Sequence, residues 1–143
     1  MSVKENQELT RWMYEELSKI KGNIGKIPPV IQKFMAPQGV YHGATGDLNY
    51  DQYLQYQVVL HTAFPDITMT VEDIFAAGDK VAIRFVIRGT HKGPFLGIPP
   101  TGKQINVKAA SIARFAGGKA EEGWAFPDML GMMQQLGVIP ARK

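Results

Sequence analysis

The stretch from Ile87 to Pro140 reads IRGTHKGPFLGIPPTGKQINVKAASIARFAGGKAEEGWAFPDMLGMMQQLGVIP. Two segments with the pattern of β-strands flank a loop rich in glycine and proline, and a third segment ends in the run Trp124-Ala-Phe-Pro-Asp128. A short apolar helix is predicted from Met129 to Leu136. A strand that ends in a carboxylate beside aromatic residues can place an acid or a base in a pocket. Asp128 is therefore the first candidate for a catalytic residue.

Strand patterns continue on both sides of the loop. Residues with apolar side chains alternate with more polar neighbours, and Gly-Asp and Gly-Gly pairs between the segments are suited to hairpin turns. At such close spacing the segments predict a meander of four antiparallel strands. These segments are Ile67–Ala77, Val81–His91, Gln104–Phe115 and Lys119–Phe126.

Helical spacing of apolar residues precedes the strands. Leu9, Trp12, Met13 and Leu17 recur three or four positions apart, and Asn49 is a suitable N-cap for the second long helix. The expected fold class is α+β: a strongly bent antiparallel sheet whose N-terminal helices cover a conical pocket, in a single domain over residues 1–143. The predicted helices are Glu5–Ile20, Val30–Met35 and Asn49–Phe64, and a short strand is predicted over Pro37–His42.

Composition excludes several classes of function. The 143 residues are 45% hydrophobic and 20% charged, which is ordinary for a globular domain, and the sequence contains no cysteine. Disulfides, thiolate metal sites and a cysteine nucleophile are thereby excluded. The net charge of +3 is spread thinly along the chain, so we expect no nucleic-acid partner. We find neither a signal peptide nor a run of roughly 18 apolar residues, so we expect no membrane partner and a cytoplasmic location.

Two interpretations of Asp128 remain open at this point. Strict alternation would put Glu122, Trp124, Phe126 and Asp128 on one side of the last strand, where aromatic neighbours would remove water from the carboxylate and raise its pKa. Such a group suits general acid/base catalysis near neutral pH. Alternatively, Asp128 is the N-cap of the helix that follows, a position that lowers the pKa of a carboxylate.

Other polar and aromatic residues are candidates for the pocket. His42 ends a strand, His91 begins the Gly/Pro-rich loop, and Arg84 either points to solvent or faces an anion inside. Trp12 and Tyr14 either pack in the core or form a lid over the pocket. The motifs HExxH, GxSxG and GxGxxG are missing, so metal, serine-nucleophile and dinucleotide chemistry have no support, and we expect neither a metal nor a cofactor.

Several short motifs, taken in order, resemble those of the SnoaL-like polyketide cyclase family, which belongs to the NTF2-like superfamily of cone-shaped, cystatin-like α+β folds. The match spans nearly the whole chain and includes two supporting runs, Ala63-Phe-Pro-Asp66 and Gly78-Asp-Lys-Val81. The motifs are Gly89-Thr-His91-Lys-Gly93, Gly97-Ile-Pro-Pro-Thr-Gly-Lys103, Gly118-Lys119, Glu122-x-Trp124-x-x-x-Asp128 and Gln134-Gln135-Leu136-Gly137.

The resemblance implies a cofactor-independent enzyme, of lyase or isomerase type, in a homodimer or homotetramer. Characterised cyclases of the family close a ring by intramolecular aldol condensation with an aspartate as acid/base, and that aspartate falls on Asp128. The resemblance also implies that the substrate is a small hydrophobic molecule with a carbonyl group, polyketide-like or of another kind. His91 and His42 would assist catalysis, and the expected substrate-binding residues are Trp124, Phe126, Arg84, Tyr14 and Trp12.

Two alternatives to a cyclase stay open. Hydration of an epoxide needs two carboxylates and an arginine around one water, which Asp128, Glu122 and Arg84 would have to supply. The other alternative is a binding protein without catalysis, in which the same fold offers only a pocket for a small molecule.

Overall fold

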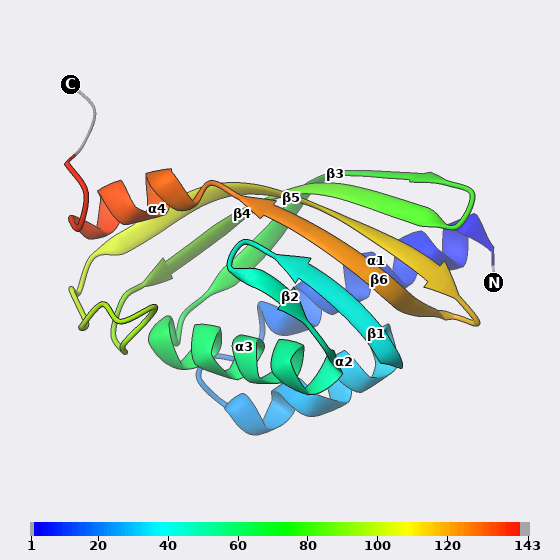
Figure 1. The fold of residues 1–143 in the computed structure, drawn as a ribbon, viewed down its shortest axis with the longest axis horizontal. Helices are drawn as coiled ribbons and strands as arrows, with labels where there is room; N and C mark the ends of the chain where they lie inside the picture. The colour runs from blue at the N-terminus through cyan, green and yellow to red at the C-terminus, as the bar shows by residue number, and fades with distance from the viewer. Residues whose placement is uncertain (1, 141–143) are drawn as a thin grey trace.

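The computed structural model describes residues 2–140 and shows a long, curved sheet with helices packed against one face (Figure 1). Helices α1 (Val3–Leu17), α2 (Ile27–Phe34) and α3 (Tyr50–Ala63) cover the inner face, and α4 (Met129–Leu136) lies at one end of the sheet. A short 3-10 turn, η1 (Ile24–Lys26), precedes α2. The strands are β1 (Met35–Gly43), β2 (Gly46–Leu48), β3 (Thr68–Ala77), β4 (Lys80–Thr90), β5 (Gln104–Ala116) and β6 (Lys119–Pro127).

The sheet is mixed rather than purely antiparallel. Its strand order is β2-β1-β6-β5-β4-β3, and the four strands from β3 to β6 form the predicted antiparallel meander. Strand β1 pairs with β6 in parallel, which corrects the expected all-antiparallel sheet. The short strand β2, which we did not predict, continues the sheet as an antiparallel neighbour of β1. The α+β fold class itself is confirmed, since the sheet is curled and unclosed with helices on its inner face.

Local signals explain where the helices begin and end. Ser2 and Glu5 form a reciprocal capping box, so α1 begins at Val3, earlier than predicted. The predicted cap Asn49 forms the same arrangement with Gln52 at the start of α3. Helix α4 has the predicted bounds, and the residue after it, Gly137, caps it with a positive φ of 82° that suits a residue without a side chain.

The hydrophobic core lies between the inner face of the sheet and the helices. On β4, Val81, Ile83, Phe85 and Ile87 are buried against α1, whereas Arg84 on the opposite face is exposed, as the alternation predicted. The same inner face continues on β5 with buried residues Ile105, Val107 and Phe115. Burial of these side chains, about 1.5–3 kcal/mol each, supplies much of the stability of the domain.

A bulge in β6 decides which side chains of that strand reach the inner face. Arg114 of β5 pairs with Glu122, but the next residue, Phe115, pairs with Ala120, so Glu121 is an extra residue in β6. Beyond this bulge the alternation is reversed, because side chains in a strand alternate with a period of two. Gly123, Ala125 and Pro127 therefore face the helices, and the residues between them face outward.

His61 provides a pH test of the packing. It is completely buried, neither ring nitrogen has a hydrogen-bond partner in residues 2–140, and burial lowers its pKa to about 4. The unfolded chain binds a proton on this histidine below its ordinary pKa of 6.5, whereas the folded protein does not, so stability is lost as the pH falls below 6.5. His61 should contribute a free energy of unfolding about 2 kcal/mol lower at pH 5 than at pH 7. Urea denaturation should show a much smaller difference for His61→Leu, and an equal difference would contradict this assignment.

Candidate functional site

A cavity lies between the inner face of the sheet and helices α1, α3 and α4. We call it the main cavity; its volume is about 40 Å³ for the centre of a water-sized sphere, and about 540 Å³ when all space between atoms, including open solvent at its mouth, is counted. None of its lining residues carries a formal charge at neutral pH. They are Tyr14, Leu17, Tyr41, Tyr53, Tyr56, Gln57, Leu60, Met69, Phe85, Ile87, Ala125, Pro127, Met129 and Met132.

A second space, which we call the side chamber, adjoins the main cavity. Its volume is about 30 Å³ for the centre of a water-sized sphere, and about 460 Å³ with open solvent included. It is lined mainly by apolar residues of α1, α2 and the strands, and Ser111 and the charged Glu122 also border it. Three tyrosines, Tyr14, Tyr41 and Tyr53, line both spaces. The rings of Tyr41 and Tyr53 pack against each other with centroids 4.4 Å apart. A ligand that occupied both spaces would contact this partition of tyrosines.

The polar groups of the main cavity are tyrosine hydroxyls and one amide, and Ser111 of the side chamber contacts one of these hydroxyls. The hydroxyl of Tyr14 and Oγ of Ser111 lie 3.0 Å apart in a hydrogen bond, and burial raises the pKa of Tyr14 to about 12. Burial also raises the pKa values of Tyr41 and Tyr53, so these phenols stay protonated at neutral pH. The buried side-chain oxygen of Gln57 has no hydrogen-bond partner in the described chain. The cavity therefore suits a neutral aromatic ligand that carries oxygen atoms.

Asp128 lies beside the main cavity rather than inside it. Its neighbours Pro127 and Met129 both line the cavity, but the aspartate itself is exposed. Its Oδ1 accepts a hydrogen bond of 2.9 Å from the backbone N–H of Gly131, so Asp128 is the N-cap of α4. The expected water-poor surroundings among aromatic side chains are therefore wrong, and the helix-cap interpretation describes the geometry.

Trp124 and Phe126 face outward because of the bulge at Glu121. Phe126 is 61% exposed and is not among the residues that line either space. Trp124 borders the side chamber, but its ring stacks on His42 on the outer face, with centroids 5.5 Å apart and the planes inclined by 26°. The prediction that both rings surround Asp128 is corrected by this change of face.

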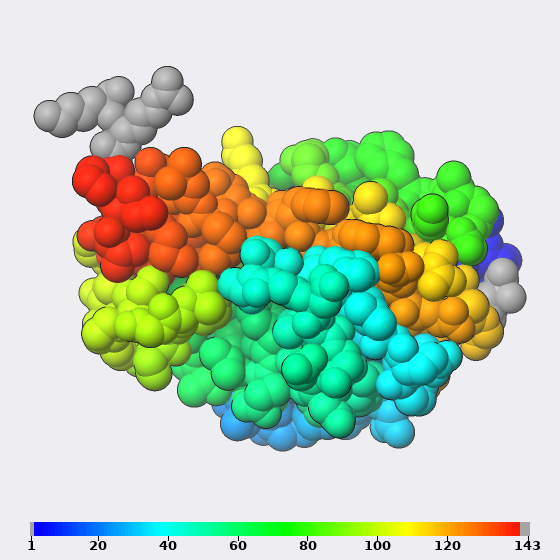
Figure 2. Space-filling model, viewed as in Figure 1, coloured from blue at the N-terminus to red at the C-terminus, as the bar shows by residue number. Residues whose placement is uncertain are grey.

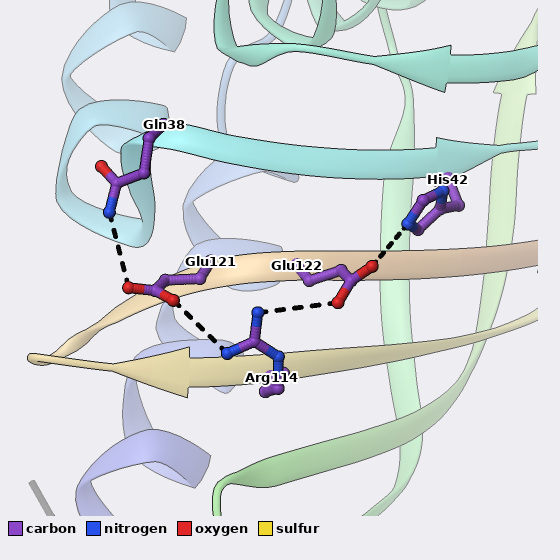
Figure 3. A network of polar contacts seen from close by, with 5 residues as sticks. All are labelled: Gln38, His42, Arg114, Glu121 and Glu122. Carbon is purple, nitrogen blue, oxygen red and sulfur yellow. Dashed lines mark hydrogen bonds and ion pairs between the residues drawn. The ribbon is translucent and has the colours of Figure 1, made fainter.

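His42 belongs to a polar network on the sheet (Figure 3) and is not among the residues that line the main cavity. Its Nδ1 lies 2.7 Å from a carboxylate oxygen of Asp47, and its Nε2 lies 2.7 Å from one of Glu122. These two hydrogen bonds raise the pKa of His42, because the protonated ring donates to both carboxylates. Arg114 joins the network through Glu121 and Glu122, with N–O distances of 3.3 and 3.6 Å.

Arg84 is paired with carboxylates of the neighbouring strand. Its guanidinium lies 2.6 Å from oxygens of both Glu72 and Asp73 on the exposed outer face. Of the two interpretations of Arg84, the structure therefore shows the one in which it points to solvent. Glu122 is held by His42 and Arg114, and Asp128 caps α4. The two carboxylates and the arginine that an epoxide hydrolase would need are therefore engaged with separate partners.

His91 anchors the Gly/Pro-rich loop instead of lining its rim. It is fully buried and stacks on Phe64 at a centroid distance of 5.3 Å. Its Nδ1 accepts a hydrogen bond from the backbone N–H of Thr101, so the neutral ring carries its proton on Nε2. Its backbone N–H donates to Lys103, and its backbone C=O accepts from Gly102. These bonds close the loop at its base, and the loop lies next to α4 at one end of the molecule (Figure 2, yellow-green and red).

The two candidates on α1 have different surroundings. Tyr14 is buried in the core and lies in the wall between the two spaces, so the structure shows core packing and not a lid. Trp12 is half-buried beside the core, with the ammonium group of Lys33 4.2 Å from its ring centroid, and it lines neither space. Of the predicted side chains, Tyr14 is the one that the structure brings into the main cavity.

Most of the cavity lining was not predicted. Tyr53, Tyr56, Gln57 and Leu60 come from one face of α3, and Tyr41 comes from β1. The sequence does indicate that these side chains share one face of a helix, because Tyr53, Tyr56, Gln57 and Leu60 are spaced three or four positions apart. The sequence does not reveal that polar-tipped side chains on this stripe would meet Tyr14, since that contact depends on how α1 and α3 cross the sheet.

Neither a metal cluster nor a spanning helix is found in the described part of the chain. Within residues 2–140, no group of three or more histidine, aspartate or glutamate side chains could hold a metal ion. Over the same residues, no helix has the length and hydropathy to cross a membrane.

Solved structures with the same fold are numerous. A protein from Jannaschia sp. CCS1, provisionally named a SnoaL-like polyketide cyclase, is 25% identical over 96% of this chain and 94% of its own, with a TM-score of 0.84. IdmH from Streptomyces antibioticus, provisionally named a polyketide cyclase, is 30% identical over 92% of this chain and 98% of its own, with a TM-score of 0.74. AclR from Streptomyces galilaeus, provisionally named a hydroxylase, is 25% identical over 99% of this chain and 87% of its own, with a TM-score of 0.81.

No curated protein sequence matches this chain significantly. A model of one protein family does, and it matches residues 11–136, from the second half of α1 to the end of α4. The predicted fold and the predicted family therefore agree with this match. The chain belongs to the SnoaL-like polyketide cyclase family.

Proposed function

We propose that the protein catalyses a cofactor-independent cyclisation of a neutral, carbonyl-containing aromatic or polyketide-like compound in the main cavity. Membership of the cyclase family supports the reaction class. The proposed class of substrate is supported by the lining of the main cavity, which consists of apolar side chains, uncharged tyrosines and one amide. Such a lining favours a ligand with aromatic surface and with carbonyl or hydroxyl oxygens, and disfavours a charged one.

In this proposal Asp128 is the acid/base. Its carboxylate removes a proton from the carbon next to a carbonyl group, and the resulting enolate carbon attacks a second carbonyl carbon of the same molecule. The new carbon–carbon bond forms as the attacked C=O becomes an alkoxide, which takes the proton back and leaves a hydroxyl group. Pro127 and Met129, the chain neighbours of Asp128, both line the cavity, so the exposed carboxylate of Asp128 would meet a substrate at the edge of the cavity. Folding the substrate against the apolar walls would supply much of the rate through proximity.

The hydroxyl pair of Tyr14 and Ser111 is proposed to bind the carbonyl oxygen that gains negative charge. Without a ligand the two hydroxyls bond to each other over 3.0 Å. Tyr14, with its pKa raised to about 12, remains a hydrogen-bond donor through the neutral range. Donors placed where an oxyanion develops stabilise the transition state more than the ground state.

Replacement of the Tyr14 hydroxyl tests this role. Tyr14→Phe keeps the ring that packs on Phe85 but removes the donor, so we expect the turnover rate to fall about 10²-fold. The unfolding free energy should change by only about 1 kcal/mol. Thermal unfolding and the rate of proton exchange on an aryl ketone measure the two effects. Tyr50→Phe, outside both spaces, is the matched control, and similar rates in both variants would remove Tyr14 from the mechanism.

The test of the whole proposal is Asp128→Asn, which keeps a cap residue and removes the base. An enzyme of the proposed kind should lose turnover and still bind the ligand. A binding protein without catalysis would show the same ligand affinity in both forms and no turnover in either. The epoxide alternative is not carried further, since Arg84 is paired with Glu72 and Asp73.

The oligomeric state stays a prediction. The outer face of the sheet carries large exposed apolar side chains, among them Phe75 (64% exposed) and Phe126 (61% exposed). Contiguous exposed apolar surface often marks a contact between proteins. We expect light scattering of the purified protein to give the mass of a homodimer or homotetramer.

A further inference from the structure

Gly131 lies under the carboxylate of Asp128 in the first turn of α4. A β-carbon at position 131 would lie 2.8 Å from Cγ of Asp128 and 3.2 Å from Oδ1, and nearer still to Oδ2. Contacts of β-carbons below 3.0 Å are essentially never tolerated without movement. The three nearest atoms all belong to Asp128, so this aspartate is the group with which a side chain at 131 would first collide.

A glycine at this position is not explained by the backbone. Gly131 lies inside a helix and is not among the glycines with positive φ, so its conformation is open to any residue. Glycine in a helix interior costs about 1 kcal/mol relative to alanine. What the missing side chain provides is room for the Asp128 carboxylate to lie against the helix.

The carboxylate is thereby held with one oxygen bound and one oxygen free. Oδ1 accepts the 2.9 Å hydrogen bond from Gly131, and within residues 2–140 no hydrogen bond to Oδ2 is found. The helix cannot easily move to make space, because both of its ends are attached to β5. The backbone N–H of Asp128 donates to Lys108 over 2.9 Å, and the side chain of Gln135 forms two hydrogen bonds with the backbone of Asn106.

We propose that Gly131 is a positioning residue that fixes the Asp128 carboxylate in one orientation and leaves Oδ2 available to the substrate proton. This inference rests on the proposed function and deepens it. Any side chain at position 131 forces the carboxylate to rotate away from the helix. The rotated carboxylate keeps its charge but loses the orientation that it has in the native cap.

The test is Gly131→Ala in the full chain, assayed by deuterium incorporation next to the carbonyl of aryl methyl ketones and aromatic β-keto esters in D2O. We expect kcat to fall about 10-fold to 100-fold with little change in KM, as for a misplacement of about 1 Å. The melting temperature should change little, because the gain in helix propensity offsets the cost of turning the carboxylate. In the Asp128→Ala background, Gly131→Ala should have no further effect on the rate.

The other possible results separate failure of the positioning role from failure of the proposed function. If Asp128→Asn is inactive but Gly131→Ala keeps a rate within about twofold of the unmodified protein, the positioning role is overturned and the proposed function stands. If Asp128→Asn is fully active, the proposed function fails, and the positioning role fails with it. If Gly131→Ala does not fold but Asp128→Ala/Gly131→Ala does, the collision is supported directly. If neither folds, Gly131 is required for another reason and the inference is overturned.

Discussion

Asp128→Asn is expected to lower the turnover rate about 10²-fold to 10⁴-fold, the range that a positioned acid/base contributes. Asparagine caps a helix about as well as aspartate, so the hydrogen bond from Gly131 should persist. Loss of the negative charge at the N-terminus of α4 should reduce the unfolding free energy by less than about 1 kcal/mol. We therefore expect Asp128→Asn to lose most of its activity and little of its stability.

Asp51→Asn is the matched control, since Asp51 is an exposed acid in the first turn of α3. It should show the same small change in stability and no change in rate. Asp128→Ala should lose about 1 kcal/mol as well as activity, because alanine cannot cap. A rate in Asp128→Asn equal to that of Asp51→Asn would leave Asp128 with a structural role only.

Phe64→Ala is expected to reduce the unfolding free energy by about 3–5 kcal/mol, the usual range for truncating a buried aromatic residue. Phe64 is completely buried, stacks on His91, and meets the edge of Phe95 at a centroid distance of 5.5 Å. Its loss would leave a cavity under the base of the loop that adjoins α4. Urea denaturation measures the effect, and Phe64→Leu should lose much less. A change below about 1 kcal/mol in Phe64→Ala would contradict the packing described here.

The elements with strong local signals were predicted well. Helix α4 runs from Met129 to Leu136 as expected, and Asn49 caps α3. The hairpins from β3 to β6 follow from turn residues and alternation, which are local properties of the chain. The parallel pairing of β1 with β6 has no such signal, because it joins segments from opposite ends of the sequence.

The candidate site was predicted less well, and one residue accounts for much of the difference. Without the bulge at Glu121, the alternation would have put Trp124 and Phe126 on the inner face beside the cavity. The sequence Ala120-Glu121-Glu122 has no glycine or proline that would have marked this bulge. The tyrosines of the cavity were missed for a different reason: a phenol in a buried wall has the same sequence pattern as one in an ordinary core.

Hydrogen exchange at carbon is the measurement that tests the central claim most directly. The unmodified protein should incorporate deuterium next to the carbonyl of an aryl ketone in D2O faster than buffer does, and Asp128→Asn should do so at the buffer rate. Tyrosine-to-phenylalanine changes in the cavity wall should give intermediate rates. Equal exchange by the unmodified protein and by Asp128→Asn would contradict the account, because it would show that this carboxylate does not move the proton.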